Sequence, residues 1–278
     1  MKNSLFFTLI SISFAFFGNA QKLEKIKGNK NVFLNQTEIN SFHTIALDED
    51  FEVEIVYNKT PSVEIETDEN LHDFIEFKVS DSVLTFNNTR KITSKKRLNI
   101  KIAYNDALKH IKTSNRAEIN SLSMVELTNG SLITTESSEA NLTIKSNNFK
   151  FEATDKSKIK LNLTADSCVF YLNGNSKLEA FINTPMVKAR LFERSQANIE
   201  GFSDNAILNL DDASRFNGKN FTMKTCNLTA ETNSNSTIEV TETLTIEASG
   251  SSEIYLYENP KIQINKFTDT VKLQKKVK

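Results

Sequence analysis

The second half of the chain repeats a short pattern: Ser or Asn, followed by residues that are mostly apolar at the second and fourth positions after it. The pattern begins at Asn115, Ser138, Ser157, Ser176, Ser195, Ser214, Ser236 and Ser252. Successive starts are 23, 19, 19, 19, 19, 22 and 16 residues apart, so the last two intervals together equal two intervals of 19. A register that returns after an irregular interval indicates a structural repeat.

Upstream of the starts lie further alternating segments, whose apolar residues fall into columns when the repeats are aligned. The columns are Phe149/Phe151/Ala153, Cys168/Phe170/Leu172, Val187/Ala189/Leu191, Ala206/Leu208/Leu210, Cys226/Leu228/Ala230 and Leu244/Ile246/Ala248. A period of two puts each triad on one face of a strand, with residues such as Lys150 and Glu152 toward solvent. A strand, tight turn, strand, looser turn unit cannot bury its own apolar face, so successive units must stack. The pattern predicts an all-β protein in which residues 112–273 form a parallel β-solenoid (β-helix) with coils of about 19 residues.

Residues 41–111 contain longer alternating runs and are predicted to form an N-terminal β cap with broad first coils, because terminal coils must cover the apolar core. Within them, 67–74 are expected to form a helical turn and 89–97 a basic loop or hairpin. Residues 21–40 are expected to be a flexible N-terminus, and 274–278 a basic tail. No Pro/Gly-rich linker divides the cap from the repeats, so the two are expected to be continuous.

The first residues have the features of a secretory signal peptide. Lys2 is followed by an apolar run, Leu5–Phe17, which has 13 residues and is too short to span a bilayer. The small residues Gly18 and Ala20 stand where signal peptidase requires them. The sequence therefore predicts that residues 1–20 are removed, that the mature chain begins at Gln21, and that it is exported to the periplasm, the outer surface or the medium. No later segment is apolar enough to cross a membrane.

Charge excludes one class of partner. The chain has 34 Lys and Arg against 35 Asp and Glu, a formal net charge of -1, whereas nucleic-acid binding requires a clustered basic excess. Gly (7) and Pro (3) are scarce, and the content of Val, Ile, Thr and Phe favours strands. We therefore expect no nucleic-acid partner and no extensive disorder.

The two cysteines are predicted to be free, although an exported chain would ordinarily pair them. Cys168 and Cys226 occupy the same column, with Val187 and Ala206 between them, so they lie three coils apart. At about 4.8 Å per coil the gap is about 14 Å. This separation exceeds the reach of a disulfide, so both thiols should be buried core residues.

No catalytic constellation is evident. The three histidines, His43, His72 and His110, are isolated and lie outside the regular repeats. Asp211 and Asp212 form a carboxylate pair, but they occupy a turn position, where Asp is favoured for its hydrogen bonds to the backbone. We expect no enzyme activity, no cofactor and no metal site.

Two alternating carboxylate pairs in the cap leave one alternative open. Glu52/Glu54 and Glu64/Glu66 could hold a cation across adjacent strands, although a solvated outer face explains them equally simply.

One candidate ligand site is expected on the outward face of the repeats. Tyr171 lies one repeat before Arg190, as Val169 does before Lys188, and stacking at about 4.8 Å per coil would make each pair neighbours. An aromatic ring beside cations can stack on a sugar ring and bond its hydroxyl or acidic groups. The candidate ligand-binding residues are therefore Tyr171, Lys188 and Arg190. The alternative is that they form ordinary cross-strand pairs on a solvated sheet.

The sequence from about residue 41 to 273 resembles the adhesin head family with the GIN domain. The resemblance is carried by Phe42–Ile55, Val63–Leu71, Asp81–Phe86 and the serial Ser turns. The family favours Gly-Ser-Gly turns, whereas this chain has Ser, Asn or Lys in place of Gly, and Ser249–Ser251 is its nearest approach. The resemblance implies a β-helical protein exported by a Gram-negative bacterium and active in surface adhesion, without catalytic residues.

The expected partner is a glycan or another surface or matrix ligand. A purely structural envelope protein and a carbohydrate-active β-helix enzyme are the rival classes. Asp81-Ser82 and Asp269-Thr270, each followed by Val, also resemble an O-glycosylation site of some bacterial exported proteins.

Overall fold

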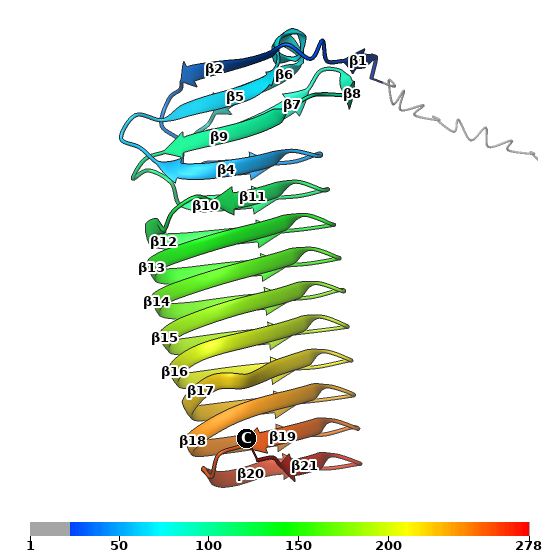
Figure 1. Ribbon diagram of the computed structural model, residues 1–278. Helices are drawn as coiled ribbons and strands as arrows, with labels where there is room; N and C mark the ends of the chain where they lie inside the picture. The colour runs from blue at the N-terminus through cyan, green and yellow to red at the C-terminus, as the bar shows by residue number, and fades with distance from the viewer. Residues whose placement is uncertain (1–22, 278) are drawn as a thin grey trace, which may run out of the picture.

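The computed structural model describes residues 23–277 and shows an elongated stack of coils, a parallel β-solenoid of about nine turns (Figure 1). Strands account for 68% of the residues and helix for 2%. The all-β solenoid with coils of about 19 residues is thus confirmed. The predicted signal peptide, residues 1–20, lies outside the described residues. Among those described, no helix is long and apolar enough to cross a membrane.

The strands divide into a cap and a stack. The cap contains β1 (Lys25–Lys27), β2 (Val32–Glu38), β3 (Thr44–Leu47), β4 (Glu52–Tyr57), β5 (Ser62–Asp68), the 3-10 helix η1 (Glu69–Phe74), β6 (Ile75–Ser80), β7 (Val83–Asn88), β8 (Lys91–Ser94) and β9 (Leu98–Tyr104). The stack contains β10 (His110–Thr113), β11 (Glu118–Ser121), β12 (Val125–Thr134), β13 (Glu139–Ala153), β14 (Lys158–Leu172), β15 (Lys177–Leu191), β16 (Gln196–Leu210), β17 (Arg215–Ala230), β18 (Asn235–Ala248), β19 (Glu253–Tyr257), β20 (Lys261–Phe267) and β21 (Lys272–Lys275).

Each regular coil is one long strand that bends in the middle. In β13 the buried positions run on even numbers to Ser146 and then on odd numbers from Phe149, with two exposed residues, Asn147 and Asn148, between them. This change of parity turns the strand back toward the core. The Ser146 hydroxyl donates a hydrogen bond to the Asn148 carbonyl (3.0 Å) across the bend. The predicted looser turn is therefore a bend within a continuous strand.

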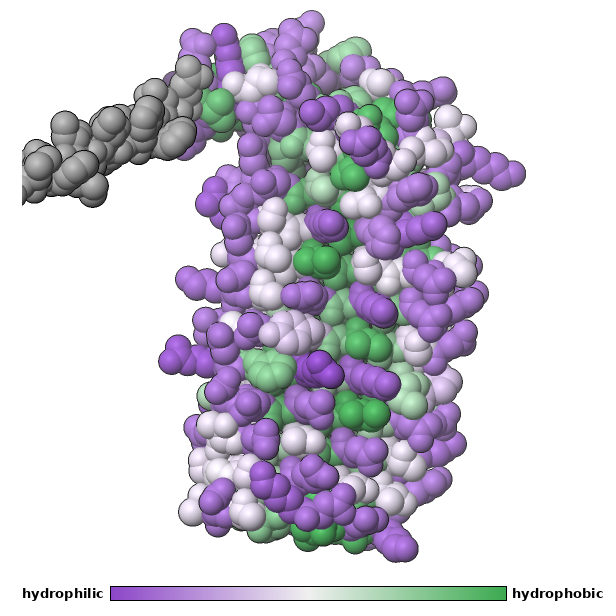
Figure 2. Space-filling view, turned by 180° about the vertical axis from the view of Figure 1, so that it is seen from behind, coloured by the Kyte–Doolittle hydropathy of each residue, from purple (hydrophilic) through white to green (hydrophobic). Residues whose placement is uncertain are grey.

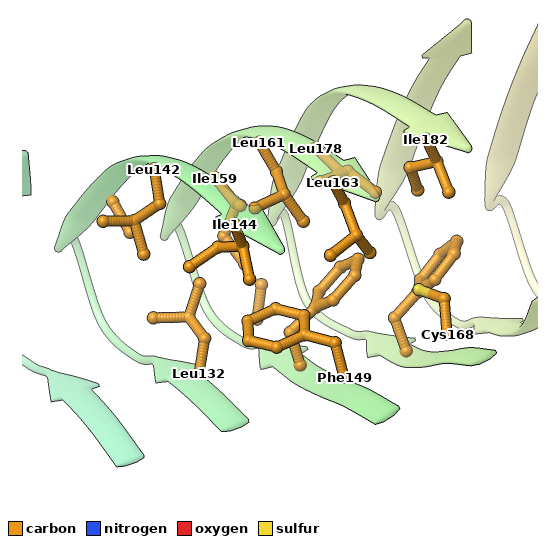
Figure 3. Packing of buried hydrophobic residues seen from close by; sticks show 14 of the residues in the cluster. Leu132, Leu142, Ile144, Phe149, Ile159, Leu161, Leu163, Cys168, Leu178 and Ile182 are labelled. Carbon is orange, nitrogen blue, oxygen red and sulfur yellow. The ribbon is translucent and has the colours of Figure 1, made fainter. Parts of the chain in front are cut away.

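The bend gives the solenoid two layers. We call the layer of residues 139–146 of β13 and their ladder partners the A layer, and the layer of residues 148–153 and their partners the B layer. Side chains from the two layers meet in the core, where Leu142 and Ile144 face Leu132 and Phe149 (Figure 3). Phe151 and Phe170 stack face to face on successive coils, with ring centroids 4.8 Å apart and an interplanar angle of 6°. The predicted apolar columns are confirmed, because Cys168 pairs with Val187, Val187 with Ala206 and Ala206 with Cys226.

A short turn links each coil to the next. Its second residue has a positive φ, as at Asp155 (φ 60°), and its fourth is usually a buried serine such as Ser157. The Ser157 hydroxyl donates a hydrogen bond to the Thr154 carbonyl (2.7 Å), which closes the turn from inside. The same bond recurs in turns at Ser138, Ser195 and Ser252. The predicted structural role of the turn serines is confirmed here.

Two of the predicted repeat starts were wrong by two residues. The buried position that ends the turn is occupied by Ala117 rather than Asn115, and by Ser234 rather than Ser236. Ser236 lies within β18, pairs with Phe216 and points into the core. The sequence pattern required an apolar residue at that inward position, and a buried serine there shifted the alignment.

The cap continues the two ladders of the stack. β3 pairs with β10 and β4 with β11, both parallel, and one hydrophobic core extends from Phe42 to Leu256. Residues 69–74 form the expected helical turn as η1. The expectation of a flexible segment at 21–40 was wrong for its described part, because β1 pairs with β8 and β2 pairs antiparallel with β5. Where the cap ends and the repeats begin, placed at residues 111/112 from the sequence, stays a prediction.

Candidate functional site

The three predicted ligand residues lie together on the outer face of the B layer. Tyr171 of β14 is the register partner of Arg190 of β15, and Val169 is the partner of Lys188. Their places follow from strand alternation, since the residues between them, Phe170 and Ala189, point into the core. The strands of the B layer lie behind the A layer in Figure 1, and Figure 2 shows this face from outside.

The side chains of this face form a shallow groove of about 510 Å³. Along it, hydrophobic and hydrophilic side chains alternate in the direction of the solenoid axis (Figure 2). We define the B-layer groove by its outward side chains: Ser131, Ile133, Lys150, Glu152, Val169, Tyr171, Lys188 and Arg190. The Val169 side chain is exposed (39%), and the Tyr171 ring packs at 5.5 Å from the Phe192 ring, which holds its edge.

The groove carries more positive than negative charge. Within the part of the chain that the structure describes, Lys150, Lys188 and Arg190 make no ion pair and no side-chain hydrogen bond, and Glu152 is the carboxylate of the groove. Elsewhere on the solenoid, outward lysines are paired: Lys272 lies 3.0 Å from Glu253. Because the groove cations have no protein partner, an approaching anionic group would not have to break an existing ion pair.

The sequence missed several members of the groove. Lys150 and Glu152 lie 19 residues before Val169 and Tyr171, so the repeat itself could have revealed them. Ile133 joins through the pair Ile133/Glu152 between β12 and β13. Its position is harder to foresee, because the neighbouring coil is longer than the regular ones.

The histidines form no catalytic set. His72 contacts the Phe33 carbonyl through Nε2 (3.1 Å). His43 and His110 are not isolated, as expected from the sequence, but lie on neighbouring strands, where the His110 N–H donates to the His43 carbonyl (3.0 Å). Burial, together with nearby Lys112 and Lys109, lowers the pKa of His110. No cluster of three metal-ligating side chains occurs among residues 23–277.

The Asp211/Asp212 pair forms part of a turn. The Asp211 carboxylate accepts a hydrogen bond from the Asp212 N–H and from the Thr232 hydroxyl, both 2.6 Å long. The Asp212 carboxylate accepts one from the Glu193 N–H of the preceding coil (3.4 Å). These bonds link successive turns, as expected from turn chemistry.

The proposed cation site between the glutamate pairs was based on a wrong strand order. β4 and β5 are not adjacent, because β9 lies between them. Lys101 of β9 pairs with Glu64 at 2.9 Å, and this carboxylate raises the pKa of Lys101. Arg97 pairs with Glu66 at 2.6 Å. Protein cations therefore already neutralise the β5 carboxylates.

Both cysteines are free and buried, as predicted. Burial raises the pKa of Cys226 to about 12 and raises that of Cys168 strongly as well. The thiols are therefore unreactive core groups at neutral pH.

The two glycosylation-like motifs both lie in turns. Asp81 and Ser82 have positive φ values of 50° and 61° and form the turn between β6 and β7. Asp269 and Thr270 occupy the last coil turn, where Thr270 is exposed. Whether either carries a glycan stays a prediction.

Comparison with known proteins connects this fold to adhesins. The family described as "Putative auto-transporter adhesin, head GIN domain" matches residues 41–182 and 162–260. A crystal structure named "putative adhesin" from Parabacteroides merdae is similar with a TM-score of 0.66 and 18% identity, covering 91% of this chain and 100% of that one. A "putative lipid binding protein" from Parabacteroides distasonis is similar with a TM-score of 0.59, 18% identity and the same coverage. No curated protein matches the sequence. At such identities the structural similarity establishes the fold alone.

Proposed function

The chain belongs to the family of adhesin heads with the GIN domain, and from this premise we propose that it is an exported binding protein that attaches to a surface glycan or matrix ligand through the B-layer groove. Neither the matched family nor the similar structures are described as enzymes. Export is supported by the signal-peptide pattern of residues 1–20.

One observation carries the proposal: an aromatic ring lies beside three cations that have no partner in the described residues. Tyr171 presents a ring supported by Phe192, and Arg190 is its register neighbour. Lys150 and Lys188 lie on the two sides of Val169 in the next column. Such a surface offers a stacking platform together with donors for hydroxyl, carboxylate or sulfate groups. A purely structural coil would gain nothing from leaving these cations unpaired.

The proposal is tested with the double variant Tyr171→Ala/Arg190→Ala. We expect residues 21–278 of the wild type to bind a ligand identified in a glycan and matrix screen. The double variant should bind about tenfold or more weakly, because one stacking contact and one charge-assisted hydrogen bond are lost. Circular dichroism and thermal melting would establish that the solenoid is intact.

The control is Lys160→Ala/Phe181→Ala, which removes an exposed cation and an exposed ring from the A layer. It should bind as the wild type does. Unchanged binding by the folded Tyr171/Arg190 variant would contradict the proposal, and so would an equal loss in both variants.

A further inference from the structure

Positive charge on the B layer occurs on every second coil. Lys112 lies on β10, Lys150 on β13, and Lys188 with Arg190 on β15. The intervening coils present uncharged, mainly apolar side chains at the same two outward columns: Ser131 and Ile133 on β12, Val169 and Tyr171 on β14, Ile207 and Asn209 on β16. The order along the axis is established by the ladder partners Lys112/Ile133, Ile133/Glu152, Val169/Lys188 and Lys188/Ile207.

This alternation has a defined length. Successive coils are about 4.8 Å apart, so the cationic coils recur about every 9.6 Å along the solenoid axis. The four cations are exposed, and none of them has an ion pair within residues 23–277. Glu152 stands opposite them as the one carboxylate of the two columns between β10 and β16. The face therefore offers a row of positive charges with a two-coil period, separated by surfaces for apolar contact.

We infer that the groove binds a linear anionic polysaccharide that lies along the solenoid axis and carries its carboxylate or sulfate on alternate sugar units. The inference rests on the proposed function and specifies its ligand class. Acidic units bind Lys112, Lys150 and Lys188/Arg190 through charge-assisted hydrogen bonds. The unit between two acidic ones lies over Val169 and Tyr171, where its C–H face contacts the valine and the aromatic ring.

Two features favour this ligand over others. A polymer with a charge on every unit would place half of its charges over Ile133 and Val169, which would desolvate them without a partner. A neutral polymer would leave the unpaired cations unused. The groove runs along the axis, so its length suits an extended chain rather than a single sugar.

The experiment compares hyaluronate oligosaccharides, which carry a carboxylate on alternate sugars, with polygalacturonate oligomers, which carry one on every sugar, and with neutral maltohexaose. Binding to residues 21–278 is measured by titration calorimetry at two ionic strengths. We expect hyaluronate to bind most tightly and its affinity to fall as salt rises. Maltohexaose should not bind measurably.

The decisive variant moves one charge by a single coil. Val169→Lys/Lys188→Val keeps the net charge and the composition but places the lysine on β14 instead of β15. It should weaken hyaluronate binding about tenfold, the loss of one charge-assisted contact, and leave polygalacturonate binding within about twofold of wild type. Lys188→Gln should weaken hyaluronate similarly if the double variant does not fold. Lys160→Gln, on the A layer, should change nothing.

Three outcomes would overturn the inference. These are full hyaluronate affinity in the charge-shifted variant, tighter binding of polygalacturonate than of hyaluronate, and binding to phosphatidylglycerol vesicles with no oligosaccharide binding. If a screened ligand or surface still depends on Tyr171 and Arg190 in these cases, the proposed function stands and only the ligand class is wrong. If no ligand depends on them, both fail.

Discussion

Small side chains decide how each coil closes and fits the next. The turn serines are buried and satisfy their hydroxyl groups with a carbonyl three residues earlier, as Ser195 does with Phe192 (2.7 Å). Cys168 and Cys226 fill core positions that Val187 and Ala206 fill in the coils between them. Residues of such different chemistry are interchangeable there because the site requires small volume and internal hydrogen bonding rather than a particular group.

The thiols give a prediction at this scale. Folded protein treated with iodoacetamide at pH 8 should remain unmodified at both cysteines, because burial raises the pKa of Cys226 to about 12 and keeps the thiol protonated and inaccessible. After unfolding in guanidinium, both should be alkylated, and mass spectrometry should count two additions. A Cys168–Cys226 disulfide found without reductant would mean that the coil register is wrong.

At the scale of the element, the coil is held by contacts between identical columns rather than within its own sequence. The stacked pair Phe151/Phe170 is the clearest case, since each ring covers the other across adjacent coils. Removing one ring therefore affects two coils at once.

Phe170→Ala should lower the free energy of unfolding by about 3–5 kcal/mol, because it removes a fully buried ring and leaves a cavity. Guanidinium unfolding followed by circular dichroism would measure the change. The matched control is Phe181→Ala, whose ring is 46% exposed on the A layer and whose loss should cost less than about 1 kcal/mol. Equal losses for the two variants would contradict the stacking of the B-layer column.

At the scale of the whole molecule, the solenoid is a one-dimensional stack in which each regular coil contacts mainly its two neighbours. Lys177 and Gln196 occupy equivalent positions on β15 and β16. A complete coil can therefore be removed without changing the pairing of the remainder.

Deletion of residues 177–195 should give a folded protein about 4.8 Å shorter, because Gln196 takes the place of Lys177 and the columns reconnect. Small-angle scattering and circular dichroism would test this. Deletion of residues 177–186, about half a coil, should abolish folding, since inward residues would then meet the wrong partners. If the whole-coil deletion unfolds as completely as the half-coil one, the independence of the coils is disproved.

The sequence by itself determined the stack: a period of two within strands and of 19 between them left one register, and this register placed the core columns, the two distant cysteines and the Tyr171/Arg190 pair. Only the tertiary structure decided the cap, because its antiparallel strands do not follow the repeat. There β9 separates β4 from β5, and β2, whose side chains are mostly exposed, shows no burial pattern to reveal it as a strand. Tertiary structure also brought Lys112 and Ile133 into line with the groove, since the long first coil breaks the spacing of 19. Local alternation records which face of a strand is buried, whereas strand order depends on long-range pairing that leaves no period in the sequence.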